Sequence, residues 1–181
     1  MIDKFKRIKR EVLRKSNVLT YCIDTMQLPD GQTQEYDMML HNGASAVVPV
    51  TDEGKLVMVK QYRLSFDRVT LEVPAGKRDG DEEFIKAAER ELLEETGYTC
   101  SKIEPFITID TAIAYCDEEI KVFLATGLKK TDRQHTDPDE FIDVGEYELS
   151  DLKKMIFNHE IRDSKTIACI MAYSAYLENR G

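Results

Sequence analysis

The sequence predicts a mixed α/β domain with an antiparallel strand extension at its N-terminus. The chain has 181 residues, of which 42% are hydrophobic and 33% are charged, and this suits one domain of ordinary size. Strand-like segments come first, then one helix, then further strands and helices. This order lacks the regular strand–helix alternation of a doubly wound parallel sheet. We therefore predict an α+β arrangement built on a mixed sheet.

The N-terminal extension is predicted over residues 1–40. Strand-like residues 18–26 and 34–40 flank Pro29-Asp30-Gly31, a turn signal. The first 16 residues hold seven Lys or Arg and two acidic residues, and they are expected to form a solvated strand or helix.

The main domain is predicted over residues 41–181. Its strands are expected at 44–50, 56–62, 69–73, 103–109, 120–125 and 141–149, and its helices at 81–96, 152–158 and 165–178. The first of these helices is expected to end at Gly97, because glycine readily adopts the left-handed conformation that stops a helix.

Composition excludes several classes of protein. The formal net charge of −9 argues against a general nucleic-acid binder, which needs a basic face. The apolar stretches are far shorter than a membrane span, so no membrane partner is expected. Four cysteines without a CxxC pair indicate reduced thiols and a cytoplasmic location.

The helix at 81–96 carries carboxylates where a core-facing stripe should be apolar. At 100° per residue, Glu91 and Glu95 project close to Phe84, and Glu94 lies on the flank beside Arg90. Charged residues rarely occupy such positions unless they are paired or bind a metal. Either basic partners from elsewhere or a divalent cation would make the cluster tolerable.

Eight residues in and around this helix recur at a set spacing. They are Gly76, Glu82, Arg90, Glu91, Leu92, Glu94, Glu95 and Gly97. The pattern resembles the signature of the Nudix hydrolases, which cleave a nucleoside diphosphate linked to another moiety. The resemblance implies an α/β/α sandwich.

The signature also implies roles for its residues. Gly76 would permit a sharp turn and a close approach to phosphates. Arg90 lies two helical turns from Glu82, so the two can pair. By the resemblance, the metal ligands would be Glu91, Glu95, Glu94 and the carbonyl of Ala75, and hard oxygen ligands suit Mg²⁺, with Mn²⁺ as a substitute.

Further residues resemble the ADP-ribose pyrophosphatase and nucleotide-sugar branch of that family. They are Lys60-Gln61-Tyr62-Arg63 and Leu71-Glu72-Val73-Pro74-Ala75-Gly76. This branch implies a homodimer with crossed N-terminal strands and a nucleoside diphosphate sugar as substrate, with ADP-ribose expected first. It assigns Arg63 to the diphosphate. Glu72 and Tyr36 are further expected substrate-binding residues, although a strand Glu can simply face water.

One position differs from the pattern of this branch in the region that would form the nucleotide pocket. ADP-ribose-specific members carry a proline where this chain has Ile113. The chain also has no Trp, so Tyr21, Tyr36 or Tyr115 would have to stack on a base.

The general base is expected from a loop before the last strand. By the resemblance Glu140 matches this position, with Glu94 as the competing base and Asp139 as a fallback.

Other functions remain as alternatives to ADP-ribose hydrolysis. Hydrolysis of GDP-mannose or another nucleotide sugar is the nearest, followed by a catalytically silent nucleotide-binding module and an RNA-end pyrophosphohydrolase. His41, His135 and His159 show no metal-ligand spacing and are expected to be structural or solvated.

Overall fold

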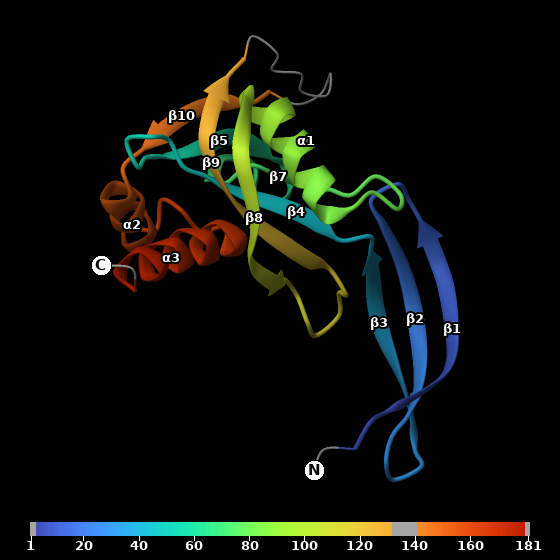
Figure 1. Cartoon of the computed structure of the whole chain (residues 1–181). Helices are drawn as coiled ribbons and strands as arrows, with labels where there is room; N and C mark the ends of the chain where they lie inside the picture. The colour runs from blue at the N-terminus through green and yellow to red at the C-terminus, as the bar shows by residue number, and fades with distance from the viewer. Residues whose placement is uncertain (1–2, 132–140, 180–181) are drawn as a thin grey trace. The chain divides into compact units, whose positions relative to one another are not determined.

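The computed structural model describes residues 3–131 and 141–179 and contains two compact units (Figure 1). One unit comprises the residues up to Gly43 together with Asp110–Glu119, and the other comprises Ala44–Ile109 and the residues from Ile120 onward. The predicted extension ended at residue 40 and did not include the second segment, which is distant in sequence.

The first unit is a three-stranded antiparallel sheet. Its strands are β1 (Lys6–Lys15), β2 (Leu19–Gln27) and β3 (Thr33–His41), in the order β1-β2-β3. The basic N-terminal segment is therefore a strand, not a helix. At the β2–β3 turn Gly31 has φ of +86°, and the Asp30 carboxylate accepts a hydrogen bond from Gln32 N at 3.0 Å. The Met39 N–H donates to the Tyr115 carbonyl at 2.7 Å, which joins the segment 110–119 to this sheet.

The second unit contains two sheets. One has the order β10-β5-β6 and the other the order β7-β4-β9-β8. Strand β4 pairs in parallel with β9 and antiparallel with β7, so the second sheet is mixed, as predicted. The strands are β4 (Ala44–Pro49), β5 (Leu56–Arg63), β6 (Arg68–Glu72), β7 (Ala75–Lys77), β8 (Tyr98–Asp110), β9 (Glu119–Lys130) and β10 (Asp143–Tyr147), and the short 3₁₀ turn η1 (Leu64–Phe66) follows β5.

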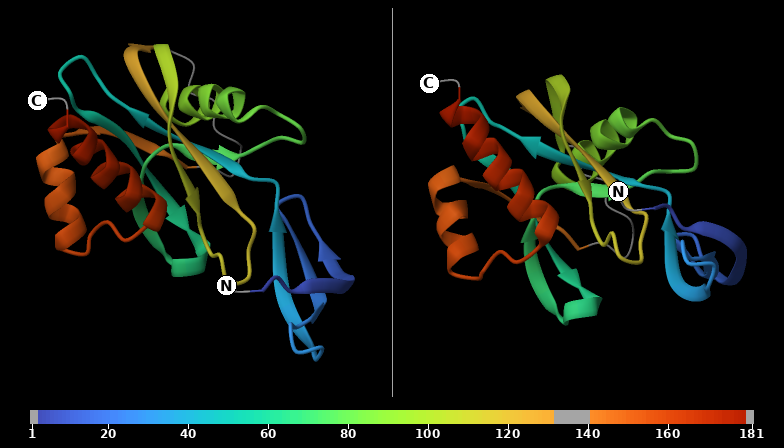
Figure 2. Two further views of the ribbon diagram at one scale, coloured as in Figure 1. Left: turned by 60° about the horizontal axis from the view of Figure 1, so that its bottom comes forward. Right: turned by 90° about the horizontal axis from the view of Figure 1, so that it is seen from below.

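Helices cover both sides of these sheets, which confirms the predicted α/β/α sandwich. They are α1 (Phe84–Thr96), α2 (Leu149–Phe157) and α3 (Ser164–Glu178). Neighbouring residues of β4 point to opposite layers: Val47 belongs to the apolar cluster of α1, and Val48 to the cluster of α2 and α3. Figure 2 shows α2 and α3 side by side, away from α1.

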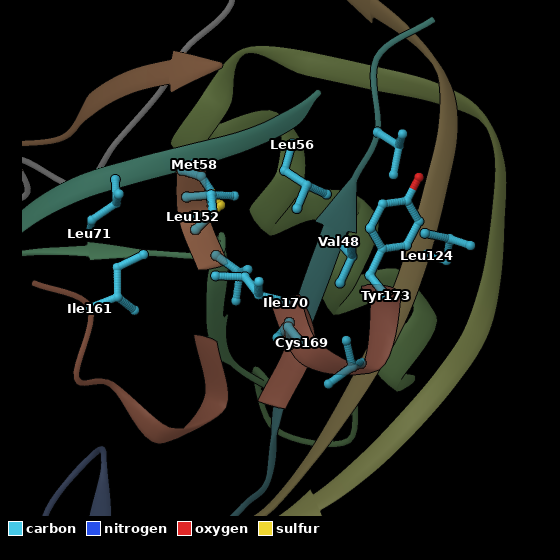
Figure 3. Packing of buried hydrophobic residues seen from close by; sticks show 14 of the residues in the cluster. Val48, Leu56, Met58, Leu71, Leu124, Leu152, Ile161, Cys169, Ile170 and Tyr173 are labelled. Carbon is cyan, nitrogen blue, oxygen red and sulfur yellow. The ribbon is translucent and has the colours of Figure 1, made fainter. Parts of the chain in front are cut away.

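The larger core cluster lies between the sheets and the two C-terminal helices (Figure 3). Leu56, Met58, Leu152, Ile161 and Ile170 are each at most 1% exposed. The cluster includes Leu71 of β6 and Ile170 of α3. Within residues 3–131 and 141–179, none of the helices is long and apolar enough to cross a membrane.

Candidate active site

Arg90 is the hub of the site that the signature residues form on α1. Its Nε and Nη2 donate to the two carboxylate oxygens of Glu82 at 3.1 and 2.9 Å, which confirms the predicted pair. Its Nη1 donates to Glu91 Oε1 at 2.6 Å and to Glu94 Oε2 at 2.9 Å. The hydrogen bonds with Glu82 raise the pKa of Arg90 against the opposing effect of burial, so the guanidinium stays charged. One arginine thus provides the basic partner for three acids.

Two further interactions tie the helix to β7. Arg90 Nη2 also donates to the Lys77 carbonyl at 3.0 Å. Glu95, only 3% exposed, accepts a hydrogen bond from Ala75 N at 2.9 Å. The C-terminal end of the helix is as predicted, with Gly97 at φ +71° and its N–H bonded to the Leu93 carbonyl. The signature residues (the box) and α1, which carries most of them (the box helix), are therefore held as one unit with β7.

The surroundings of Gly76 differ from those predicted. It lies inside the short strand β7 and does not have positive φ, so it does not form the sharp turn; the turn glycine is Gly80, at φ +55°. A Cβ at Gly76 would lie 2.0 Å from Glu91 Oε1. The Glu91 carboxylate therefore lies directly against the backbone at Gly76, and a side chain at this position would displace it.

The donor set of the box suits a divalent cation. Glu91 and Glu95 are 9% and 3% exposed and offer carboxylate oxygens of the kind that Mg²⁺ prefers. In the part of the chain that the structure describes, no three His, Cys, Asp or Glu side chains converge as a ready metal cluster. Instead, Arg90 neutralises Glu91 and Glu94. A cation at Glu91 would therefore compete with Arg90.

Glu72, an expected substrate-binding residue, is buried, which excludes the alternative that it simply faces water. It is 2% exposed, and both of its oxygens accept hydrogen bonds from the Arg63 guanidinium, at 2.7 Å each. Thr70 Oγ1 donates to Oε1 at 2.6 Å, and Lys165 Nζ donates to Oε2. Burial by itself raises the pKa of Glu72, but these donors and the charge of Lys165 outweigh it and hold the pKa at about 2.

Arg63 is paired with a buried carboxylate and is close to the box helix. Its side chain is 40% exposed, so part of the guanidinium reaches solvent. The hydrogen bonds of Glu72 raise the pKa of Arg63 against burial, and the negative charge of Glu95 adds to this effect. Arg63, Glu72 and Lys165 line a pocket of about 440 Å³, and the pocket also includes Arg68, Arg162 and Asp163.

The sequence did not indicate Lys165, Thr70 or Asp163 as parts of this site. The only local signal was Asp163 before a helix, where its carboxylate caps the Thr166 N–H at 3.0 Å. Lys165 lies far from Glu72 in sequence, and no spacing rule links the two.

Tyr98 directly follows Gly97, the last glycine of the signature. Its ring is 8% exposed within the α1 cluster, and its hydroxyl donates to Glu146 Oε1 of β10 at 2.7 Å. Burial and this hydrogen bond raise the pKa of Tyr98 to about 12. The position therefore stays apolar with its polar atom paired.

The candidate base-stacking tyrosines all lie in the first unit. Tyr36 on β3 is 36% exposed, and its ring centroid is 6.4 Å from that of Phe5. The Tyr21 hydroxyl donates a hydrogen bond to Asp37 at 2.5 Å. Tyr115 is 54% exposed, and Ile113, which stands where the branch has a proline, is 82% exposed. The expected bases Glu140 and Asp139 lie outside the described residues.

Comparisons with known proteins identify the family. The NUDIX domain family matches residues 39–168. The chain is 39% identical over 166 residues to the ADP-ribose pyrophosphatase of Bacillus subtilis (strain 168), covering 91% of this chain and 90% of that protein. It is 33% identical over 174 residues to the ADP-ribose pyrophosphatase of Mycobacterium tuberculosis (strain H37Rv), covering 94% and 84%. A crystal structure of an ADP compounds hydrolase has the same fold, with a TM-score of 0.88 at 18% identity over 100% of this chain and 98% of the other. With the signature residues assembled around Arg90, these similarities show that the chain belongs to the Nudix hydrolase family.

Proposed function

We propose that this chain hydrolyses the diphosphate bond of ADP-ribose to give AMP and ribose 5-phosphate, with Mg²⁺ as its cofactor and Mn²⁺ as a substitute. The observation that carries this proposal is the complete signature cluster on α1, held by Arg90. The Glu72–Arg63 pair supports it, because Arg63 is near enough for the charge of Glu95 to raise its pKa. The names of the two relatives support ADP-ribose as the substrate. A catalytically silent module would be expected to have lost at least one of these acids.

One group of residues would bind the cation, and Arg63 would bind the diphosphate. Glu91, Glu94, Glu95 and the Ala75 carbonyl would hold the divalent cation, which screens phosphate charge and lowers the pKa of an attacking water. Arg63 uses Nε and Nη2 on Glu72, so its other N–H donors are available to a diphosphate oxygen. The buried Glu72 fixes the plane of the guanidinium, which orients those donors.

A substrate panel tests this function directly. The purified chain is incubated with Mg²⁺ and ADP-ribose, GDP-mannose, UDP-glucose or NADH, and the phosphatase-sensitive products are measured. We expect the highest kcat/KM with ADP-ribose and no turnover in EDTA. Preference for GDP-mannose would transfer the function to nucleotide-sugar hydrolysis, and no turnover of any substrate would favour a binding module.

For the general base we propose Glu140. Replacing Glu140 with Gln should lower kcat by about 100-fold and leave KM nearly unchanged, because only proton transfer in the transition state is lost. Steady-state kinetics on ADP-ribose measures both constants. The matched variant is Glu94→Gln: an unchanged kcat in Glu140→Gln with a collapse in Glu94→Gln would move the base to the box helix, and Asp139→Gln tests the remaining candidate.

We also propose that the N-terminal extension, residues 1–40, forms a homodimer of cytoplasmic chains. Four apolar side chains of its N-terminal segment, Phe5, Ile8, Val12 and Leu13, are 47–55% exposed. Small sheets need an apolar face packed on another element for stability. In a crossed dimer Tyr36 would reach the nucleotide of the neighbouring subunit. The cytoplasmic location rests on four free cysteines.

The oligomeric state follows from light scattering. We expect a mass of twice the 20.8 kDa chain for the wild type, and a monomer with a raised KM for ADP-ribose when Ile8 and Val12 are both replaced with Lys. The matched control is Glu11→Gln, which changes charge on the same strand without removing apolar surface. A monomeric wild type at micromolar concentration would contradict the dimer, and a monomeric double variant with normal KM would contradict the shared pocket.

A further inference from the structure

The Glu72 carboxylate is paired with two cationic side chains, although Arg63 alone already donates to both of its oxygens. The carboxylate is 2% exposed. Lys165 adds a second cation at Oε2, and its side chain is itself only 12% exposed. Burying a lysine is costly unless it is paired, so its presence here calls for a specific role.

Lys165 is held in place by the start of α3. Its Nζ donates to Asp163 Oδ2 at 2.9 Å as well as to Glu72. The next residue, Thr166, is fully buried, and its Oγ1 accepts a hydrogen bond from Val73 N at 3.1 Å. The first turn of α3 is thus fixed to the residue that follows Glu72, just before the signature begins. Lys165 and Glu72 cannot easily move apart.

The contacts of Lys165 distinguish an indirect role from direct substrate binding. The lysine is largely buried and divides its donors between Glu72 and Asp163, whereas Arg63 is 40% exposed and keeps N–H donors for a ligand. The negative charge of Glu95 on the box helix also raises the pKa of Arg63. Lys165 lines the same pocket, but its side chain is 12% exposed against 40% for Arg63, so Arg63 offers a ligand the larger surface and Lys165 mainly contacts Glu72 and Asp163.

We propose that Lys165 is a positioning residue for the hydrolysis reaction, because it fixes the Glu72 carboxylate that orients Arg63 toward the diphosphate. Without Lys165, Oε2 of Glu72 would keep only Arg63 Nη2 as a donor, and the carboxylate could turn with the guanidinium. The bidentate geometry would loosen, and Arg63 would bind the diphosphate less well. This inference rests on the proposed function, because that function assigns Arg63 to the substrate diphosphate.

A double-mutant cycle measures the role of Lys165. Replacing Lys165 with Met should raise KM for ADP-ribose by about 10-fold, as loss of an outer partner typically does, and Lys165→Arg should restore most of the loss. In an Arg63→Ala background, the same Lys165→Met change should cost less than about twofold, because there is no guanidinium left to orient. Equal losses in both backgrounds would overturn the inference, since Lys165 would then act on substrate or on the fold independently of Arg63.

A spectroscopic signature separates this inference from the proposed function. The Nε–H resonance of Arg63, assigned by its loss in Arg63→Lys, should be sharp and slow to exchange in the wild type and in Lys165→Arg, and broadened in Lys165→Met. The matched control is Lys153→Met, which removes a lysine bonded to Ser174 elsewhere on the helical layer and should leave the resonance unchanged.

The outcomes remain distinct. No turnover of ADP-ribose with an intact resonance response would reject the proposed substrate and retain the positioning role. An unchanged resonance in Lys165→Met would overturn the positioning role whatever the activity. If Lys165→Met does not fold, Lys165→Gln, which keeps an N–H donor without the charge, takes its place in both measurements.

Discussion

Replacing Glu95 with Gln should lower kcat/KM for ADP-ribose by at least about 100-fold in Mg²⁺, a loss typical of removing a principal electrostatic stabiliser. Glu95 is 3% exposed, and its Oε2 accepts a hydrogen bond from the Ala75 N–H at 2.9 Å. The amide of Gln keeps an acceptor oxygen for that bond and nearly the same shape. The substitution therefore removes charge from the proposed cation site with little change in packing.

Two measurements accompany this variant. The melting temperature without metal should stay near that of the wild type, because an acid is lost from an acid-rich cluster. The increase in melting temperature on adding Mg²⁺ should shrink, since binding to the folded state is weakened. Glu89→Gln, on the same helix with its carboxylate bonded to Lys86 Nζ, is the matched control and should keep normal rates. Near-normal rates in both Glu95→Gln and Glu91→Gln would contradict the role of the helix.

Local patterns in the sequence were sufficient for the box helix. The positions of Glu91 and Glu95 on the core-facing stripe follow from the period of an α-helix, and both side chains are buried. The Arg90–Glu82 pair follows from their spacing across the loop–helix junction. These features depend on residues within a few turns of one another, so the chain itself encodes them locally.

The environment of Glu72 could not be predicted in the same way. The sequence does not show whether a single glutamate in a strand is buried or exposed. The buried Glu72 is paired with Lys165, and the helix that carries Lys165 is brought to the sheet by tertiary contacts. Gly76 illustrates a related limit. The sequence predicted a sharp turn at Gly76, but it could not show that the Glu91 carboxylate lies against this residue.

Arg90 links fold stability to metal binding, and its replacement should reveal the acid cluster. Without Arg90, the Glu82, Glu91 and Glu94 carboxylates would lose the guanidinium that binds all three. Removing one partner of a buried ion pair costs roughly 3–5 kcal/mol. Because the Arg90 side chain is 26% exposed, we expect Arg90→Met to destabilise the metal-free protein by about 2 kcal/mol. For a chain of this size that corresponds to a fall in melting temperature of about 4–8 °C.

Magnesium should then recover more stability in Arg90→Met than in the wild type. The variant leaves a higher local negative charge and removes the donor that competes for Glu91 Oε1, so a cation should bind the folded state more tightly. Melting curves in EDTA and in a series of Mg²⁺ concentrations measure this difference for the variant, the wild type and a control, Lys86→Met. Lys86 forms an exposed pair with Glu89 on the same helix and should change neither the stability nor the response to Mg²⁺. If Arg90→Met melts at the wild-type temperature in EDTA and responds no more strongly to Mg²⁺, then repulsion among the box carboxylates is not what Arg90 relieves.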